Sequence, residues 1–109
     1  MTTDQFPKNR VVQLEKSVDY ADHSIVSKAV ITSKPGNITL FAFDKGQELS
    51  EHIAPFDALV QVLEGRVQVQ VAGEPHTLEK GSSIIMPANV PHALKAIERF
   101  KMLLTMIKE

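Results

Sequence analysis

The chain has 109 residues, and its 12 basic and 13 acidic side chains give a net charge of −1 at neutral pH. That length supports a single domain, and the hydrophobic share of 43% and charged share of 23% are those of an ordinary globular protein. A balance this close to neutral argues against a nucleic-acid partner or an anionic membrane surface, because both need clustered basic residues.

Features that the sequence lacks exclude further classes. The chain contains no cysteine, so disulfides, thiolate catalysis and cysteine-based zinc sites are ruled out. No window approaches the roughly 18 apolar residues of a membrane span, and the amino terminus lacks the apolar stretch of a secretory signal. We therefore expect a cytoplasmic protein with no membrane association.

The first predicted elements follow an amino-terminal segment, residues 1–23, which we expect at the edge of the fold. Within it, residues 11–18 carry apolar side chains at mixed spacing, which favours an irregular segment or an edge strand, with a short helical turn as the alternative. Residues 25–32 and 37–43 are expected to pair as strands around the turn sequence Lys34-Pro35-Gly36.

The middle of the chain has the clearest strand pattern. Residues 66–71 alternate strictly between valine and polar side chains, which is typical of a half-buried strand. Residues 58–63 precede it across Glu64 and Gly65, and this spacing predicts a hairpin. The remaining expected strands are residues 75–78, 83–86, 92–96 and 99–107. Short strands at roughly eight-to-twelve-residue spacing indicate an all-β sandwich or barrel of two packed sheets.

Two segments refine this prediction, residues 46–65 and residues 81–92. The first holds Gly46, His52 and Gly65, and the second holds Gly81, Pro87 and His92. Their spacing resembles the two sequence motifs of the cupins. The resemblance implies a single cupin domain that spans residues 1–109. Residues 24–109 would form its jelly-roll barrel, or double-stranded β-helix, and residues 1–23 its edge segment.

Cupins usually hold a metal on three His and one Glu, and this chain keeps only part of that set. His52 and His92 stand at two ligand positions, whereas Ala54 and Ala58 stand at the second His and the Glu. In the second motif Asn89 replaces a Gly, and Asn tolerates the left-handed backbone conformation. The resemblance therefore implies at most a weakly held divalent transition metal on the two imidazoles.

Strand alternation gives the predicted pocket. Residues 52, 54, 58, 60 and 62 share the inward face if a bend at Pro55 keeps the register. The expected pocket-lining residues are His52, Ala54, Ala58, Val60, Val62, His92, Leu94 and Met102.

A few other side chains are candidate substitute ligands. Asp57 and Glu51 have the wrong parity to face the interior, and together with Glu48 they are expected on the solvated surface. His76 is expected to be a partly exposed strand residue and His23 a loop residue. Met102 and Met106 lie on one face of the last strand and could offer thioethers to copper, although methionine more often fills the core.

Three functions are compatible with these residues. The favoured one is binding of a small molecule in the barrel pocket, which two alanines make more apolar while the histidines supply polar anchors. The alternative is a metal-dependent enzyme of the dioxygenase or isomerase type using His52 and His92, and a purely structural role is the third. We also expect a homodimer, with residues 11–14 and 25–31 as candidate interface, because small open barrels expose strand edges.

Overall fold

The computed structural model describes residues 6–108, which form nine strands and one short 3-10 helix. The bounds are η1 Leu14–Lys16, β1 Ile25–Ser33, β2 Gly36–Phe43, β3 Glu48–His52, β4 Asp57–Glu64, β5 Arg66–Val71, β6 Glu74–Glu79, β7 Ser83–Met86, β8 His92–Ala96 and β9 Phe100–Ile107. Every strand predicted from the sequence is present, with ends shifted by no more than one residue.

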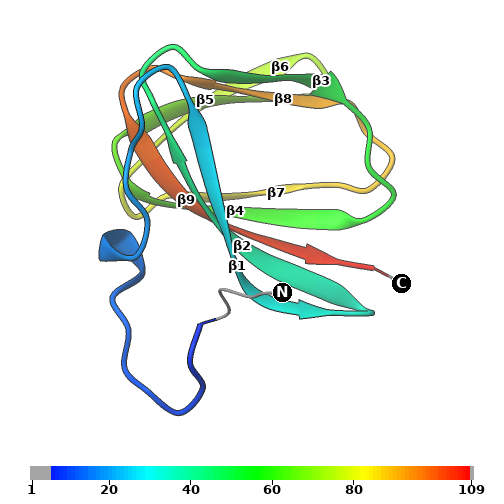
Figure 1. The fold of residues 1–109 in the computed structure, drawn as a ribbon. Coiled ribbons are helices and arrows are strands. Elements are labelled where there is room, and N and C mark those ends of the chain that lie inside the picture. Colours follow the sequence, from blue (N-terminus) through cyan, green and yellow to red (C-terminus); the bar gives the residue numbers. More distant parts are fainter. Residues whose placement is uncertain (1–5, 109) are drawn as a thin grey trace.

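The strands form two sheets that face each other (Figure 1). One sheet has five strands in the order β1-β2-β9-β4-β7, and the other has four in the order β3-β8-β5-β6. All pairings are antiparallel. Strands consecutive in the chain therefore often lie in different sheets, as expected for a jelly-roll barrel. The all-β prediction is confirmed.

The predicted hairpin between residues 58–63 and 66–71 is wrong. β4 pairs with β7 and β9, whereas β5 pairs with β6 and β8, so the chain crosses from one sheet to the other at Gly65. Gly65 has a φ of +81°, and a Cβ placed there would lie 2.7 Å from the Cα of Phe100. The glycine is thus required for close packing against β9 at a crossover, a role that spacing alone does not distinguish from a hairpin turn.

The interior between the sheets is apolar. Phe43, Val60, Val67, Val69, Phe100 and Met102 are fully buried in one core cluster. A second cluster lies on the outer face of the five-stranded sheet, where Val18 packs with Leu40 and Ala42. Leu14 and Tyr20 are partly buried against this second cluster, so the amino-terminal segment covers part of the sheet.

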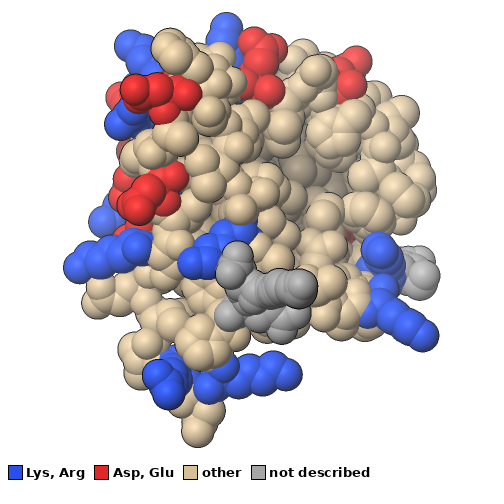
Figure 2. Space-filling model, viewed as in Figure 1, with Lys and Arg blue, Asp and Glu red and all other residues tan. Residues whose placement is uncertain are grey.

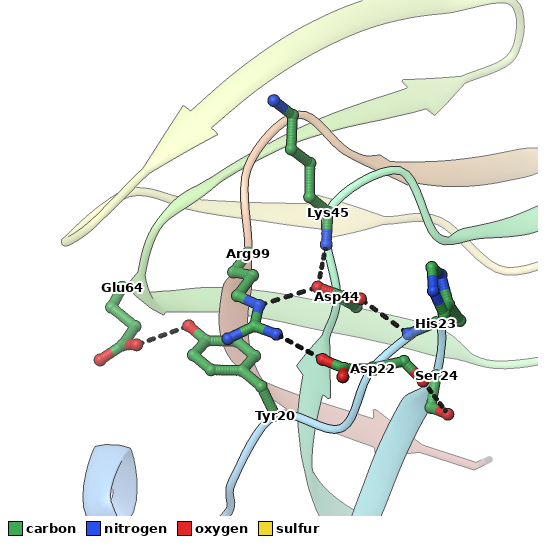
Figure 3. A network of polar contacts seen from close by, with 8 residues as sticks. All are labelled: Tyr20, Asp22, His23, Ser24, Asp44, Lys45, Glu64 and Arg99. Carbon is green, nitrogen blue, oxygen red and sulfur yellow. Dashed lines mark hydrogen bonds and ion pairs between the residues drawn. The ribbon is translucent and has the colours of Figure 1, made fainter.

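Polar contacts fasten this segment to the barrel (Figure 3). The Tyr20 hydroxyl and a Glu64 carboxylate oxygen are 2.5 Å apart. Arg99 bridges two acidic residues, with Nε 2.8 Å from Asp44 Oδ1 and Nη2 3.1 Å from Asp22 Oδ1. Residues 11–18 are irregular apart from the 3-10 turn η1, as one of the sequence alternatives proposed. Within residues 6–108, no helix is long and apolar enough to cross a membrane.

Candidate functional site

A small cavity lies inside the barrel between the ends of β3 and β8 on one sheet and β4, β7 and β9 on the other. Ten residues line it, of which only the two histidines are polar: Leu49, His52, Ala54, Ala58, Met86, His92, Leu94, Met102, Leu104 and Met106. Its volume is about 50 Å³. That is room for a few waters or a group of a few non-hydrogen atoms, since about 10–15 Å³ of such space is enough to hold one water.

The two histidines are brought together by the β3–β8 ladder, in which His52 and His92 are direct partners. Their Nε2 atoms are 3.1 Å apart. The rings meet edge to face, with centroids 4.3 Å apart and an interplanar angle of 72°. Residues opposite each other on neighbouring antiparallel strands have adjacent side chains, so the ladder register alone accounts for the contact.

Backbone carbonyls fix the tautomer of both rings. His52 Nδ1 is 2.7 Å from the carbonyl oxygen of Ser50, and His92 Nδ1 is 3.1 Å from that of Val90. A carbonyl oxygen only accepts, so each Nδ1 carries the hydrogen and donates it. In each neutral ring, Nε2 is then the acceptor. Two acceptor lone pairs therefore converge on one point, where a proton, a donor group or a cation would satisfy both.

The two rings differ in their exposure to solvent. His92 is 4% exposed, whereas His52 is exposed. Burial lowers the pKa of His92 below its usual value of 6.5, and the neighbouring His52 adds to this, while the hydrogen bond to the Val90 carbonyl opposes it. Protonation of His92 is thus disfavoured, and its Nε2 is available as an acceptor near neutral pH.

The facing wall of the cavity is made of methyl and thioether groups. Ala58 on β4 is paired with Met86 on β7 and with Met106 on β9. Met102 lies four residues before Met106 on the same strand, and hence on the same face. Apart from Met1, every methionine of the chain lines this cavity.

The space-filling view shows a hollow at the open end of the barrel, between the two sheets (Figure 2). The surface directly around it is mostly uncharged in this view, whereas acidic side chains lie along the left and upper edges of the molecule. The exposed His52 gives the cavity contact with solvent.

The structure places most of the predicted pocket residues around this cavity. His52, Ala54, Ala58, His92, Leu94 and Met102 all line it. Val60 and Val62 do not; they face inward as their parity predicted, but lie deeper, in the packed core. Sequence reasoning missed Leu49, Met86 and Leu104 as lining residues. Met86 could have been found from its place directly before Pro87 in the second motif.

The other candidate ligands lie elsewhere. Asp57 is exposed and accepts a hydrogen bond from the backbone N–H of Ala88, and Glu48 and Glu51 are also exposed. His76 is 3.4 Å from Glu74 on β6 and does not line the cavity. The backbone N–H of His23 donates to Asp44, in the network of Figure 3.

Comparison with known proteins identifies the family. Residues 39–107 match the family model described as the cupin domain. The chain belongs to the cupin family. Among solved structures, it is 35% identical to a conserved protein of unknown function from Streptococcus pyogenes, with a TM-score of 0.91 over 95% of this chain and 91% of that one.

Two further structures support the assignment. This cupin is 42% identical to a cupin 2 conserved barrel domain protein from Leptotrichia buccalis, with a TM-score of 0.83, over 86% of this chain but only 46% of that one. It is 26% identical to a cupin superfamily protein from Desulfitobacterium hafniense, with a TM-score of 0.89 and 94% of each chain covered. No protein with a curated description matches the chain.

The metal set that the family implies does not fit this cupin. Only two nitrogen donors converge, and within residues 6–108 no three His, Asp or Glu side chains are grouped so that they could hold a metal. Catalytic zinc sites keep three protein ligands, and non-haem iron oxygenases use two His and a carboxylate. The carboxylate position is occupied by Ala58, whose neighbours on both sides are methionines.

Proposed function

We propose that this cupin binds a small molecule in the barrel cavity, with the His52–His92 pair as its polar anchor. The observation that carries the proposal is the convergence of two Nε2 acceptors, 3.1 Å apart, on a cavity that is otherwise apolar. Small-ligand sites commonly combine an apolar wall with a few placed polar groups.

The chemistry of the pair limits the ligand. Both Nδ1 hydrogens are engaged by backbone carbonyls, so the neutral pair can accept hydrogen bonds but cannot donate them. A group that enters the cavity should therefore bring a donor, such as a hydroxyl or an amide N–H. Because the cavity holds about 50 Å³, only a terminal group of a few atoms is enclosed, and the rest of a larger ligand would lie outside, beyond His52.

Matched small probes test this proposal. Propan-2-ol and acetone have nearly the same size, but only the alcohol donates a hydrogen bond. In ¹⁵N NMR spectra of the protein labelled at its histidine rings, propan-2-ol should shift the Nε2 resonances of His52 and His92 in a saturable way. Acetone should not shift them. Ala58→Leu should abolish the effect by filling the cavity while keeping both histidines. Equal responses to the two probes, or binding that survives Ala58→Leu, would contradict the proposal.

The second candidate is a metal-dependent enzyme of the dioxygenase or isomerase type. The tautomers favour it, because hydrogen bonding at Nδ1 is the usual arrangement of metal-ligating histidines and leaves Nε2 free. The missing third ligand counts against it. A divalent metal held by two imidazoles would be lost on dialysis against a mild chelator without unfolding the protein. Stoichiometric Fe²⁺ or Mn²⁺ that survives dialysis would favour the enzyme.

A further inference from the structure

The donors around the cavity differ from the family's set in kind as well as in number. Cupins usually combine imidazoles with one hard carboxylate, whereas here the carboxylate position is Ala58. Its two cross-strand partners are Met86 and Met106, and Met102 lines the same cavity. The Cβ atoms of directly opposite residues on neighbouring strands lie about 4.5–5.5 Å apart. The thioether side chains therefore lie on both sides of Ala58, the position at which other cupins have the carboxylate.

We infer that the cavity is a site for monovalent copper, held by the Nε2 atoms of His52 and His92 and by thioether sulfur from the methionines of the facing sheet. The inference rests on the proposed function in that it takes the same cavity to be a binding site. It goes further by naming a soft metal ion as the ligand. Thioether and imidazole ligands suit copper(I), whereas carboxylates suit harder ions.

The separation of the two nitrogens fits a bent arrangement. If each nitrogen lies about 2.1 Å from the ion, the two would be about 4.2 Å apart in a linear complex and about 3.4 Å apart in a tetrahedral one. The observed 3.1 Å would correspond to an angle of about 95° at the ion, so the pair fits a bent arrangement and not a linear one. A bent pair leaves coordination positions open towards the rest of the cavity. The remaining lining side chains include three methionines and no other donor group.

Charge also favours a monovalent ion. No carboxylate lines the cavity, whose only donor groups are two imidazoles and three thioethers. The cost of moving an ion out of water grows with the square of its charge, and a buried charge without an opposite charge is expensive. A divalent ion would carry that penalty with no carboxylate to offset it, whereas a copper(I) ion carries about a quarter of it.

The site is also placed for metal uptake. His52 is exposed at the open end of the barrel, while His92 and the methionines Met86 and Met102 are buried behind it. An ion can therefore meet one imidazole in solvent before it reaches the second imidazole and the thioethers. Since backbone carbonyls already orient both rings, binding needs little reorganisation of the histidines.

Anaerobic competition with a chromophoric copper(I) chelator tests the inference on the purified, untagged protein. One equivalent of copper(I) should be withdrawn from the chelator. Silver(I), a redox-inert substitute, should shift the ¹³C-methyl resonances of Met86, Met102 and Met106. Zinc(II) should bind far more weakly than copper(I), because it gains little from thioethers.

Variants separate the two kinds of donor. Met86→Leu, Met102→Leu and Met106→Leu nearly conserve volume and should keep the fold. At least one of them, and the combined Met86→Leu/Met106→Leu protein, should lose copper(I) affinity by about tenfold or more, since even outer-shell changes have effects of that size. Zinc(II) affinity, which depends on the imidazoles, should stay unchanged in the same proteins. His52→Ala should lose both metals.

Three outcomes would overturn the inference: zinc(II) binding tighter than copper(I), copper(I) affinity unchanged in every Met→Leu protein, or silver(I) leaving the methionine methyl resonances unmoved. These outcomes are distinguishable from failure of the proposed function. The propan-2-ol response depends on His52, His92 and the empty space beside Ala58, and the Met→Leu substitutions leave all three in place.

Discussion

Asp57 and Ala88 link the two motif segments at the edge of the cavity. The carboxylate Oδ1 of Asp57 accepts a 2.8 Å hydrogen bond from the backbone N–H of Ala88. The neighbouring Asn89 N–H donates to the Ala54 carbonyl, also at 2.8 Å. Asp57 is thus turned away from the interior, as strand parity predicted, and holds the loop that leads to His92.

Removal of the Asp57 carboxylate should loosen this loop. Asp57→Ala should lower the free energy of unfolding by about 1 kcal/mol, the usual net contribution of such a hydrogen bond. Urea denaturation measures the loss, and amide exchange at Ala88 should become faster. Asp57→Asn keeps an acceptor oxygen and should retain most of the stability. If Asp57→Ala and Asp57→Asn were equally destabilised, the hydrogen bond would not be the cause.

The example of Asp57 shows what strand alternation can predict. Parity alone placed Ala58 inside the barrel and Asp57 outside, and the alternating valines placed β5 correctly. Asn89 has a φ of +64°, the backbone conformation for which the motif usually has a glycine. These features are local, because they depend on the two-residue period of a strand and on backbone sterics.

Features that depend on three-dimensional packing were not predictable in the same way. Gly65 has the sequence context of a hairpin turn but mediates a crossover, because β4 pairs with β7 and β9, which lie far away in the chain, and not with β5. The two alanines predict a more apolar pocket, but the size of the pocket also depends on Met86 and Met106, which reach the same space from neighbouring strands and leave about 50 Å³. The arrangement of such flexible side chains cannot be read from spacing.

The crossover at Gly65 can be tested against a second glycine with the same backbone angle. Gly65 and Gly73 both have a φ of +81°, but only at Gly65 would a Cβ meet neighbouring atoms, those of Arg99 and Phe100. Gly73→Ala should cost about 1–2 kcal/mol from backbone strain alone. Gly65→Ala should cost more than about 3 kcal/mol, because overlap with β9 is added. Similar losses in the two proteins would argue against tight packing at the crossover.

Asp44 should contribute to acid stability. A hydrogen bond from Arg99, supported by the backbone N–H groups of His23 and Lys45, lowers the pKa of Asp44 from 3.8 to about 2 (Figure 3). A carboxyl group that binds its proton less tightly when folded stabilises the protein above its unfolded pKa, and this contribution is lost as the pH falls through its folded pKa. Stability should therefore fall between about pH 4 and pH 2.

Asp44→Asn should flatten this part of the pH profile, measured by urea denaturation at a series of pH values. Asp19→Asn removes a carboxyl group elsewhere, in the amino-terminal segment, and controls for the change in net charge. A profile in Asp44→Asn as steep as that of the parent would show that other carboxyl groups govern acid unfolding.

We predict a homodimer whose interface includes the amino-terminal segment and β1. Val11 is 98% exposed, and Ile31 on the edge strand β1 is 56% exposed. An apolar groove of about 510 Å³ lies between residues 6–12 and residues 29–32. Sedimentation equilibrium should give twice the chain mass of 12.1 kDa at micromolar concentration.

Substitutions at the two edges of the five-stranded sheet test the location of this interface. Ile31→Lys places a charge on the β1 edge and should weaken the dimer, because lysine on an edge strand opposes pairing. Ile85→Lys makes the same change on β7, where Ile85 is 63% exposed, and should leave the dimer intact. A monomeric parent would reject the prediction. If both variants weakened the dimer equally, the interface would not be centred on β1.

Restoring the family's ligands should create a tight site for a divalent metal. Ala54→His and Ala58→Glu together would add an imidazole and a carboxylate to the cavity that His52 and His92 already line. Without metal, the variant should be less stable than the parent by several kcal/mol, on the order of 2–4, because Ala58 is 3% exposed and a carboxylate there is buried without a partner. With nickel(II) or zinc(II) at about a thousand times the dissociation constant, binding should raise the free energy of unfolding of the variant by about 4 kcal/mol.

The contrast between the two conditions is the decisive measurement, made by thermal unfolding with and without metal. Ala54→His with Ala58→Gln provides a nearly isosteric control: it should lose less stability without metal, because the amide carries no charge, and gain less when metal is added. The parent, with two imidazoles and no carboxylate, should change little with either metal. If the His/Glu variant unfolded like the parent under both conditions, the side chains at positions 54 and 58 would not reach the His52–His92 pair, and the register on either side of Pro55 would be wrong.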